Sequence, residues 1–142
     1  MLRKSMVLLT FLAGTGFAAE DVRQLAKMPP AAEANLREEM RANLLNLNEI
    51  ISLTVAGKLK EAGELAEKEL GQTAMGKNRA LPVNARPGAN MPPAMHELGL
   101  EGHKIASAFA AIAATGDREK TLAALPTLSG SCLGCHHSYR IR

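Results

Sequence analysis

The chain has 142 residues, with 17 Lys and Arg against 14 Asp and Glu, and a formal net charge of +3. Arg3 and Lys4 belong to an N-terminal segment that we expect to be removed. Their loss leaves 15 basic against 14 acidic residues, a charge of +1. This balance argues against nucleic acid as a partner, because no basic surplus remains to neutralise phosphates. Aromatic residues make up only 3% of the chain and Trp is absent, so Ala, Leu and Met must pack the core.

The N-terminus predicts an export signal. Two basic residues precede an uncharged stretch at residues 6–17, and small residues follow that suit cleavage after Ala18. A stretch of about 12 apolar residues is too short to span a bilayer, which disfavours an uncleaved anchor. We expect residues 1–18 to be a cleaved signal peptide and residues 19–142 to form one exported domain in the periplasm. We expect no membrane insertion of the mature chain.

The first half of the mature chain predicts two helices and a long connection. The first helix should begin near Pro29-Pro30, where proline suits a first turn, and should end near Gly57. A second is expected from about Lys58 to Leu70. Residues 71–93 are rich in Gly and Pro and predict a loop. The apolar stripe expected to face inward on the first helix consists of Leu36, Met40, Leu44, Leu47, Ile51 and Val55.

The second half predicts two further helices. The third should start after Pro93 and end at Gly116-Asp117, with an inward seam at spacings of three and four. The fourth should carry Cys132 and Cys135 on its inner face, and Pro126 should kink or interrupt it. We find no pattern of alternating β-branched residues that predicts a strand. Four amphipathic helices with two short turns and one longer connection predict an all-α fold, an antiparallel four-helix bundle.

The C-terminal sequence SGSCLGCHHSYRIR contains the only two cysteines, Cys132 and Cys135, followed directly by His136. On a helix, positions i, i+3 and i+4 share one face, so both thiols and the imidazole point the same way. Covalent haem needs this arrangement, because two thiols add to its vinyl groups while an adjacent imidazole reaches the iron. C-x-x-C-H is the sequence sign of that attachment. We predict one haem c, covalently held through Cys132 and Cys135 and ligated by His136.

Two rival interpretations use the same residues. A Cys132–Cys135 disulfide of the thioredoxin type would expect a βαβ context, which the sequence lacks. A zinc ion would take both cysteines, either His136 or His137, and one more ligand, but the sequence has no second cysteine pair or H-x-x-x-H to close a structural site. Export favours haem, because covalent haem attachment belongs to the periplasmic side of the membrane. We expect His137, about 100° round the helix from His136, to face solvent.

The pattern C-x-x-C-H-x-x-Y-R on the last helix of an exported helical chain resembles the class II cytochromes c, the cytochrome c′ group and its low-spin relatives. The resemblance implies a four-helix bundle with thioether bonds at both cysteines and His136 as the proximal ligand. It further implies that Tyr139 packs on the haem edge and that Arg140 lies near the proximal ring or a propionate. Arg140 could equally be a solvated cation at a helix C-terminus. The family often dimerises through its first two helices, so a homodimer is possible here.

In this family the residue over the iron separates two activities. Members with a methionine from the first helix are low-spin electron carriers, and members with an apolar residue there are high-spin and bind nitric oxide or carbon monoxide. Here Met40 is the expected sixth ligand, and a His/Met pair would raise the reduction potential. Methionine at helical spacing also serves as core filler. Leu36 stands at the position where the family often carries arginine. This departure leaves open a register shifted by one residue, in which Met40 or Leu44 covers the iron without binding it.

Other residues offer alternative axial ligands. Met28 precedes the first helix, and Met91 and Met95 flank the start of the third. His96 and His103, seven residues apart, share a helix face and could bind iron together or hold a second metal.

We therefore expect a periplasmic monohaem electron carrier that meets transient redox partner proteins through a small interface. The alternative is a five-coordinate haem protein that binds nitric oxide or carbon monoxide. We do not expect an enzyme, because the sequence identifies no His or Arg on the distal side of the haem for acid–base catalysis.

Overall fold

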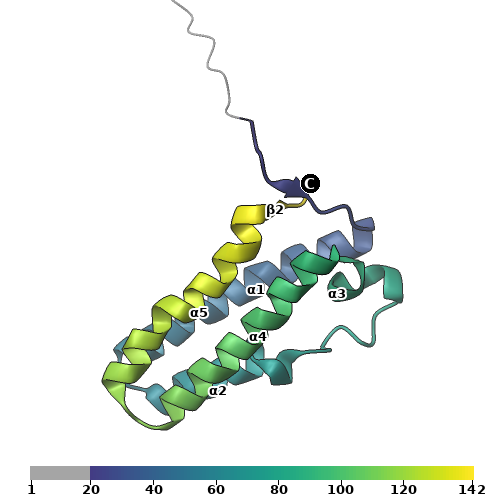
Figure 1. Cartoon of the computed structure of the whole chain (residues 1–142). Coiled ribbons are helices and arrows are strands. Elements are labelled where there is room, and N and C mark those ends of the chain that lie inside the picture. The colour runs from purple at the N-terminus through teal and green to yellow at the C-terminus, as the bar shows by residue number, and fades with distance from the viewer. Residues whose placement is uncertain (1–19) are drawn as a thin grey trace, which may run out of the picture.

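The computed structural model describes residues 20–142 (Figure 1), and the expected signal peptide at residues 1–18 lies outside the described residues. The predicted all-α class is confirmed, because most of the described chain is helical. The α-helices are α1 (Pro30–Val55), α2 (Leu59–Glu69), the short α3 (Pro87–Asn90), α4 (Pro93–Ala114) and α5 (Arg118–Ser138). Two 3-10 helices, Gln72–Ala74 and Val83–Ala85, lie in the connection between α2 and α4.

The ends of the long helices follow from local sequence chemistry. Pro30 occupies the first turn of α1, where its missing N–H costs nothing. Gly57 and Gly116 adopt φ values of +79° and +75°, which an L side chain rarely adopts, and they end α1 and α4. Asp117 caps α5, because its side chain accepts a hydrogen bond of 3.0 Å from the N–H of Lys120. The predicted boundaries of α1, α2 and α4 are confirmed to within a few residues.

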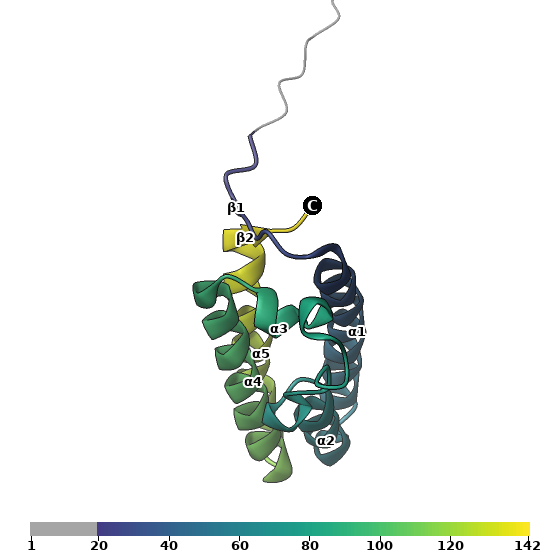
Figure 2. The same cartoon turned by 90° about the vertical axis from the view of Figure 1, so that its right-hand side faces the viewer.

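The long helices pack in pairs. Helix α2 packs against both α1 and α4, and α4 also packs against α5, while contact between α1 and α5 is sparser. Figure 2 shows α1 and α2 on one side of the molecule and α4 and α5 on the other. The connection at residues 71–92 lies against α1, through the 3-10 helix at Val83–Ala85 and through α3. This connection is the long loop that the sequence predicts, with three short helical turns in it.

The core divides into two apolar clusters. The larger cluster joins α1, α2, α4 and α5, and its small residues let helices approach closely: a Cβ on Gly63 would lie 3.0 Å from the Ala110 oxygen. Its buried members are Ile50, Ala62, Ala66, Ala106, Phe109, Ala113 and Leu128. The smaller cluster, called the sulfur cluster below, has the buried members Ala26, Leu36 and Met95. Met28, Met40, Met91, Cys135, Tyr139 and Ile141 pack against it.

The inward stripe predicted for α1 is partly wrong. Leu36 is buried as expected, but Leu44 is 69% exposed and Val55 is 58% exposed, while Ile50 and Thr54 are buried instead. The positions of α2 and the connection decide which face of α1 is buried. The pattern of apolar residues along α1 does not by itself determine which flank is covered.

Two further expectations need correction. Helix α5 continues through Pro126 without interruption. The described chain also contains a minimal sheet, in which β1 (Gln24–Leu25) pairs in parallel with β2 (Tyr139–Arg140). Strands of two residues are too short to produce an alternating pattern, and only the tertiary structure brings their two segments together. Within residues 20–142, none of the helices combines the length and the apolar character needed to cross a bilayer.

Candidate functional site

The C-terminal motif lies in the last two turns of α5. Both cysteines are free thiols: Cys132 is exposed and Cys135 is half-buried. Their neighbour His136 is exposed. The predicted placement of the three residues on one helix is confirmed, so their side chains emerge within about 100° of one another.

Helix α4 covers the opposite flank of the motif. A Cβ on Gly134 would lie 3.4 Å from the Leu98 side chain of α4, so the Gly134 side of α5 faces α4. Residues two apart on a helix point about 200° from each other, and His136 is therefore turned away from α4. His136 and the exposed Cys132 lie on the flank of α5 that α4 leaves uncovered.

On α1, the connection covers one flank and leaves the other open. Asn35 donates a hydrogen bond of 2.8 Å to the Ala85 oxygen, and the Glu39 carboxylate pairs with Lys77 at 3.1 Å. Met40 and the exposed Leu44 lie on the neighbouring face, about 100° and 140° round the helix from Glu39. Leu44 on this face is thus left exposed, while Met40 is half-buried and packs in the sulfur cluster.

The sulfur cluster gathers thioether and thiol groups from five different segments. Of the five methionines in the described residues, all but Met75 belong to it. The Cys135 Sγ lies 4.0 Å from the main-chain oxygen of Met95. Burial, and next the neighbouring Cys132, raises the pKa of the Cys135 thiol. The cluster brings Met40 and Cys135 into one apolar environment, as the proposed ligation would need.

The alternative methionine ligands Met28, Met91 and Met95 lie in the same cluster as Met40. The histidine alternatives lie elsewhere. His103 donates from Nδ1 to the Leu70 oxygen at 2.7 Å, which turns its ring towards the end of α2. His96 is exposed and lies close to Gly88, where a Cβ would be 3.4 Å from its Nε2.

Tyr139 and Arg140 follow α5 and belong to β2, which corrects their expected place on the helix. Tyr139 packs in the sulfur cluster. The Arg140 oxygen accepts a hydrogen bond of 2.8 Å from Ala26 N, and the Arg140 Nε lies 3.7 Å from the Asp21 carboxylate. That separation suits an ion pair and is too long for a hydrogen bond, so this buried Nε has no hydrogen-bond partner among the described residues.

Sequence reasoning missed the segment that precedes α1. The Arg23 guanidinium donates from NH1 to the main-chain oxygen of His136 at 3.4 Å. It also pairs with Asp21 at 2.8 Å, and this side-chain hydrogen bond lowers the pKa of the Asp21 carboxyl to about 2. The only sequence signal was a pair of opposite charges two residues apart, just after the expected cleavage site.

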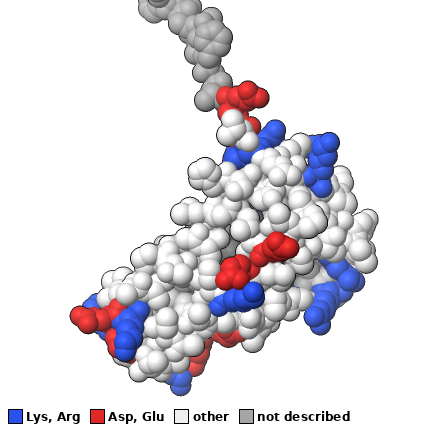
Figure 3. All heavy atoms as spheres, viewed as in Figure 1, with Lys and Arg blue, Asp and Glu red and all other residues white. Residues whose placement is uncertain are grey.

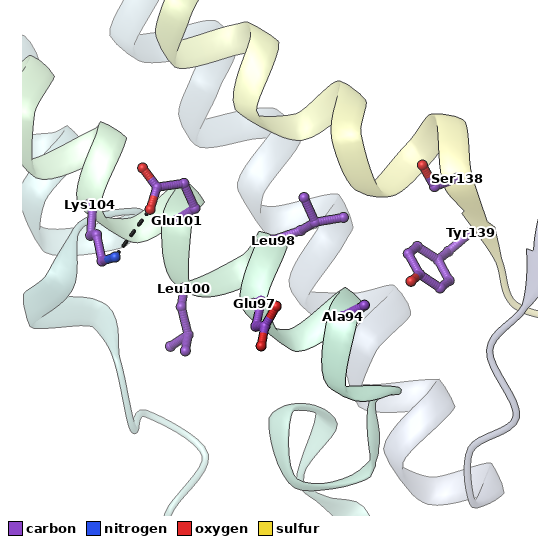
Figure 4. Close-up of a pocket in the computed structure, with 8 residues that line it drawn as sticks. All are labelled: Ala94, Glu97, Leu98, Leu100, Glu101, Lys104, Ser138 and Tyr139. Carbon is purple, nitrogen blue, oxygen red and sulfur yellow. Dashed lines mark hydrogen bonds and ion pairs between the residues drawn. The ribbon is translucent and has the colours of Figure 1, made fainter.

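A shallow groove of about 570 Å³ lies between α4 and the end of α5 (Figure 4). Figure 4 shows Leu98 pointing towards α5 and the ring of Tyr139 at the far end of the groove. Glu101 and Lys104 pair across one helical turn at 3.1 Å on its rim. The remaining lining residues are Ala94, Glu97, Leu100 and Ser138.

The donor set and its surroundings fit a covalently held haem. Two reduced thiols and an imidazole share one face, and a thioether lies in the same apolar cluster as one thiol. One turn after Met40, the Asn43 Oδ1 is buried and has no hydrogen-bond partner among the described residues, so this region holds an unmet polar group. No three His, Cys, Asp or Glu side chains in residues 20–142 gather as metal ligands.

Comparisons of the chain with protein-family models, with curated proteins and with solved structures find no match.

Proposed function

We propose that this chain is a periplasmic monohaem c-type cytochrome that carries electrons. Its four long helices, α1, α2, α4 and α5, would form the antiparallel four-helix bundle that the resemblance to class II cytochromes c implies. One observation carries the proposal: the C-x-x-C-H motif occupies one face of α5, and its Cys135 packs in the same apolar cluster as Met40.

In this proposal Cys132 and Cys135 hold one haem c through thioether bonds, and His136 and Met40 are its iron ligands. The bound haem would supply a ferrous–ferric couple. The cluster around Met40 would exclude water from one side of the site, since Leu36 is only 3% exposed. Methionine side chains are unbranched and repack readily, which suits them to surround a flat, bulky group.

Two surfaces bear on the proposed partners. Beside the motif, Leu133 is 66% exposed and Cys132 is exposed, so a transient redox partner would meet an accessible edge there. The face drawn in Figure 3 carries charges of both signs in small groups and no large field of one sign. This suits a small, short-lived interface. The exposed Leu44 and Leu45 of α1 offer a separate apolar surface to a second copy, in the proposed homodimer.

The first experiment is to export the chain in cells that attach haem and to purify it from the periplasm. We expect a coloured protein whose mass exceeds that of the processed chain by one haem. His136→Ala should keep the added mass, because both thiols remain, and should change the absorption spectrum, because the imidazole is lost. His137→Ala is the matched control and should leave the spectrum unchanged. A colourless wild-type protein with the mass of the chain alone would refute the proposal.

Leu36 favours a second candidate function. It is an apolar side chain of α1 that is only 3% exposed in the same cluster as Met40, so it could lie over the iron in place of the thioether. The protein would then be a five-coordinate haem protein that binds nitric oxide or carbon monoxide. Carbon monoxide added to the ferrous wild-type protein separates the two: the electron carrier should show no prompt spectral change, and the gas binder should.

A further inference from the structure

The segment before α1 lies along the end of α5. Strand β1 runs parallel to β2, with Gln24 opposite Tyr139 and Leu25 opposite Arg140. Figure 2 shows the two strands side by side at the end of the molecule where the C-terminus lies. We call residues 20–28 the N-terminal strap.

Arg23 of the strap caps the C-terminal end of α5 at His136, the residue proposed as an iron ligand. The last carbonyl groups of an α-helix lack N–H partners within the helix. In α5 the N–H of Tyr139 still bonds to the Cys135 oxygen, and the next carbonyl along, that of His136, accepts from Arg23 at 3.4 Å. A guanidinium at this position also interacts favourably with the negative end of the helix dipole.

Asp21 determines which nitrogen of Arg23 is left for that carbonyl. Its Oδ1 accepts a hydrogen bond from Arg23 Nε at 2.9 Å, and its Oδ2 accepts one from Arg23 NH2 at 2.8 Å. This bidentate ion pair fixes the plane of the guanidinium. NH1 then projects beyond the pair and reaches the His136 oxygen.

Residues of the strap pack in the same cluster as one of the two thiols. Ala26 is 2% exposed, and Met28 packs in the same sulfur cluster as Cys135. Cys135 is half-buried there, while Cys132, one turn earlier, is exposed. The two cysteines of the motif therefore differ in access, and strap residues contribute to the cluster that covers Cys135.

We propose that Arg23 is a positioning residue for His136 and that the N-terminal strap closes over Cys135. The role given to His136 rests on the proposed function, whereas the cover over Cys135 does not need haem. Arg23 anchors the strap to the last turn of α5.

The first test measures the alkylation rates of Cys132 and Cys135 in the full chain produced without haem. In the wild type, Cys132 should react faster than Cys135, and in urea the two should react alike. Arg23→Ala should raise the ratio of the Cys135 rate to the Cys132 rate by about two- to fivefold. This factor corresponds to the stabilising free energy that a cation contributes at a helix C-terminus. Arg23→Lys should restore most of the protection, because an ammonium can still donate to a carbonyl.

Arg118→Ala is the matched control. Arg118 donates to the Val55 oxygen at 3.3 Å, so it makes the same kind of contact at the end of α1, away from the motif. The control should leave the ratio of the two rates unchanged. The strap's role over Cys135 is overturned if the wild-type ratio matches that in urea, or if Arg23→Ala and Arg118→Ala give the same ratio.

The second test measures the reduction potential of the haem-loaded protein. Arg23→Ala should shift the potential, because the turn that carries His136 loses its anchor, while Arg23→Lys should lie close to the wild type and Arg118→Ala should match it. Equal potentials in Arg23→Ala and Arg118→Ala would overturn the positioning role. A wild type without haem would overturn the proposed function and the role of His136, and the alkylation ratio would still decide the cover over Cys135.

Discussion

Met40 of α1 and Cys135 of α5 pack in the same apolar cluster, whose buried members include Leu36 of α1 and Met95 of α4. Met40→Leu should therefore open the proposed haem iron, so that ferrous protein binds carbon monoxide that the wild type rejects. Leucine fills a similar volume, and a swap of this kind usually costs less than about 1.5 kcal/mol of stability, so the fold should persist. Absorption spectra before and after gas addition measure the effect.

Met28→Leu, Met91→Leu and Met95→Leu are controls from the same cluster. We expect each to leave the iron closed to the gas. If Met95→Leu opened the iron and Met40→Leu did not, the ligand would be Met95.

The two thiols should contribute separately to haem attachment. Cys132→Ala and Cys135→Ala should each leave haem attached through one bond, and the double substitution should release it on denaturation. Mass spectrometry of the denatured protein measures the attached haem. Retention of haem by the double variant after denaturation would contradict covalent attachment through these residues.

Gly63 marks a close approach of α2 to α4. A Cβ there would lie 3.0 Å from both the Ala110 oxygen and the Ala113 Cβ, so Gly63→Ala should force the helices apart. We expect a loss of about 1–3 kcal/mol in the free energy of unfolding, as for other overpacked sites. Urea unfolding followed by circular dichroism gives the value.

Gly99→Ala is the opposite case on α4. A Cβ at this position would meet nothing within 4 Å, so the substitution should stabilise the helix by about 0.5–1 kcal/mol. Equal effects of the two substitutions would show that α2 and α4 do not pack as closely as described.

The Asp117 carboxylate should make stability depend on pH at the start of α5. Its pKa is lowered from 3.8, first by the hydrogen bond from the Lys120 N–H and next by the Lys120 side chain. Its contribution is therefore fully present above pH 3.8 and is lost as the pH falls through the lowered value. Asp117→Ala should lower the urea midpoint at neutral pH, and the difference from the wild type should shrink in acid. Asp117→Asn keeps the cap without the charge and should remove this pH dependence. A difference between Asp117→Ala and the wild type that stayed constant from pH 7 to acid would count against the prediction.

Helix boundaries were predictable from the sequence, because they depend on residues that act locally. Pro30 in a first turn, Gly57 and Gly116 in the left-handed conformation and Asp117 as a cap act through their own backbone geometry or hydrogen bonds. The placement of Cys132, Cys135 and His136 on one face was predictable for the same reason, since helical spacing alone determines it.

The buried flank of α1 was not predictable in full. Leu44 and Ile50 are both apolar and both lie on an amphipathic helix, yet one is exposed and the other buried. The difference comes from the position of α2 and of the connection, which contact α1 from segments far along the chain. A pattern along one helix does not contain that information.

The sequence alone determined the all-α class, the ends of the long helices and the face shared by the C-terminal thiols and imidazole, because short-range geometry governs these features. Only the tertiary structure decided that Arg23 reaches the His136 carbonyl and that four methionines share one apolar cluster with Cys135. These contacts join the two ends of the described chain with its middle. They form when the helices pack and bury apolar surface, and no local spacing in the sequence encodes them.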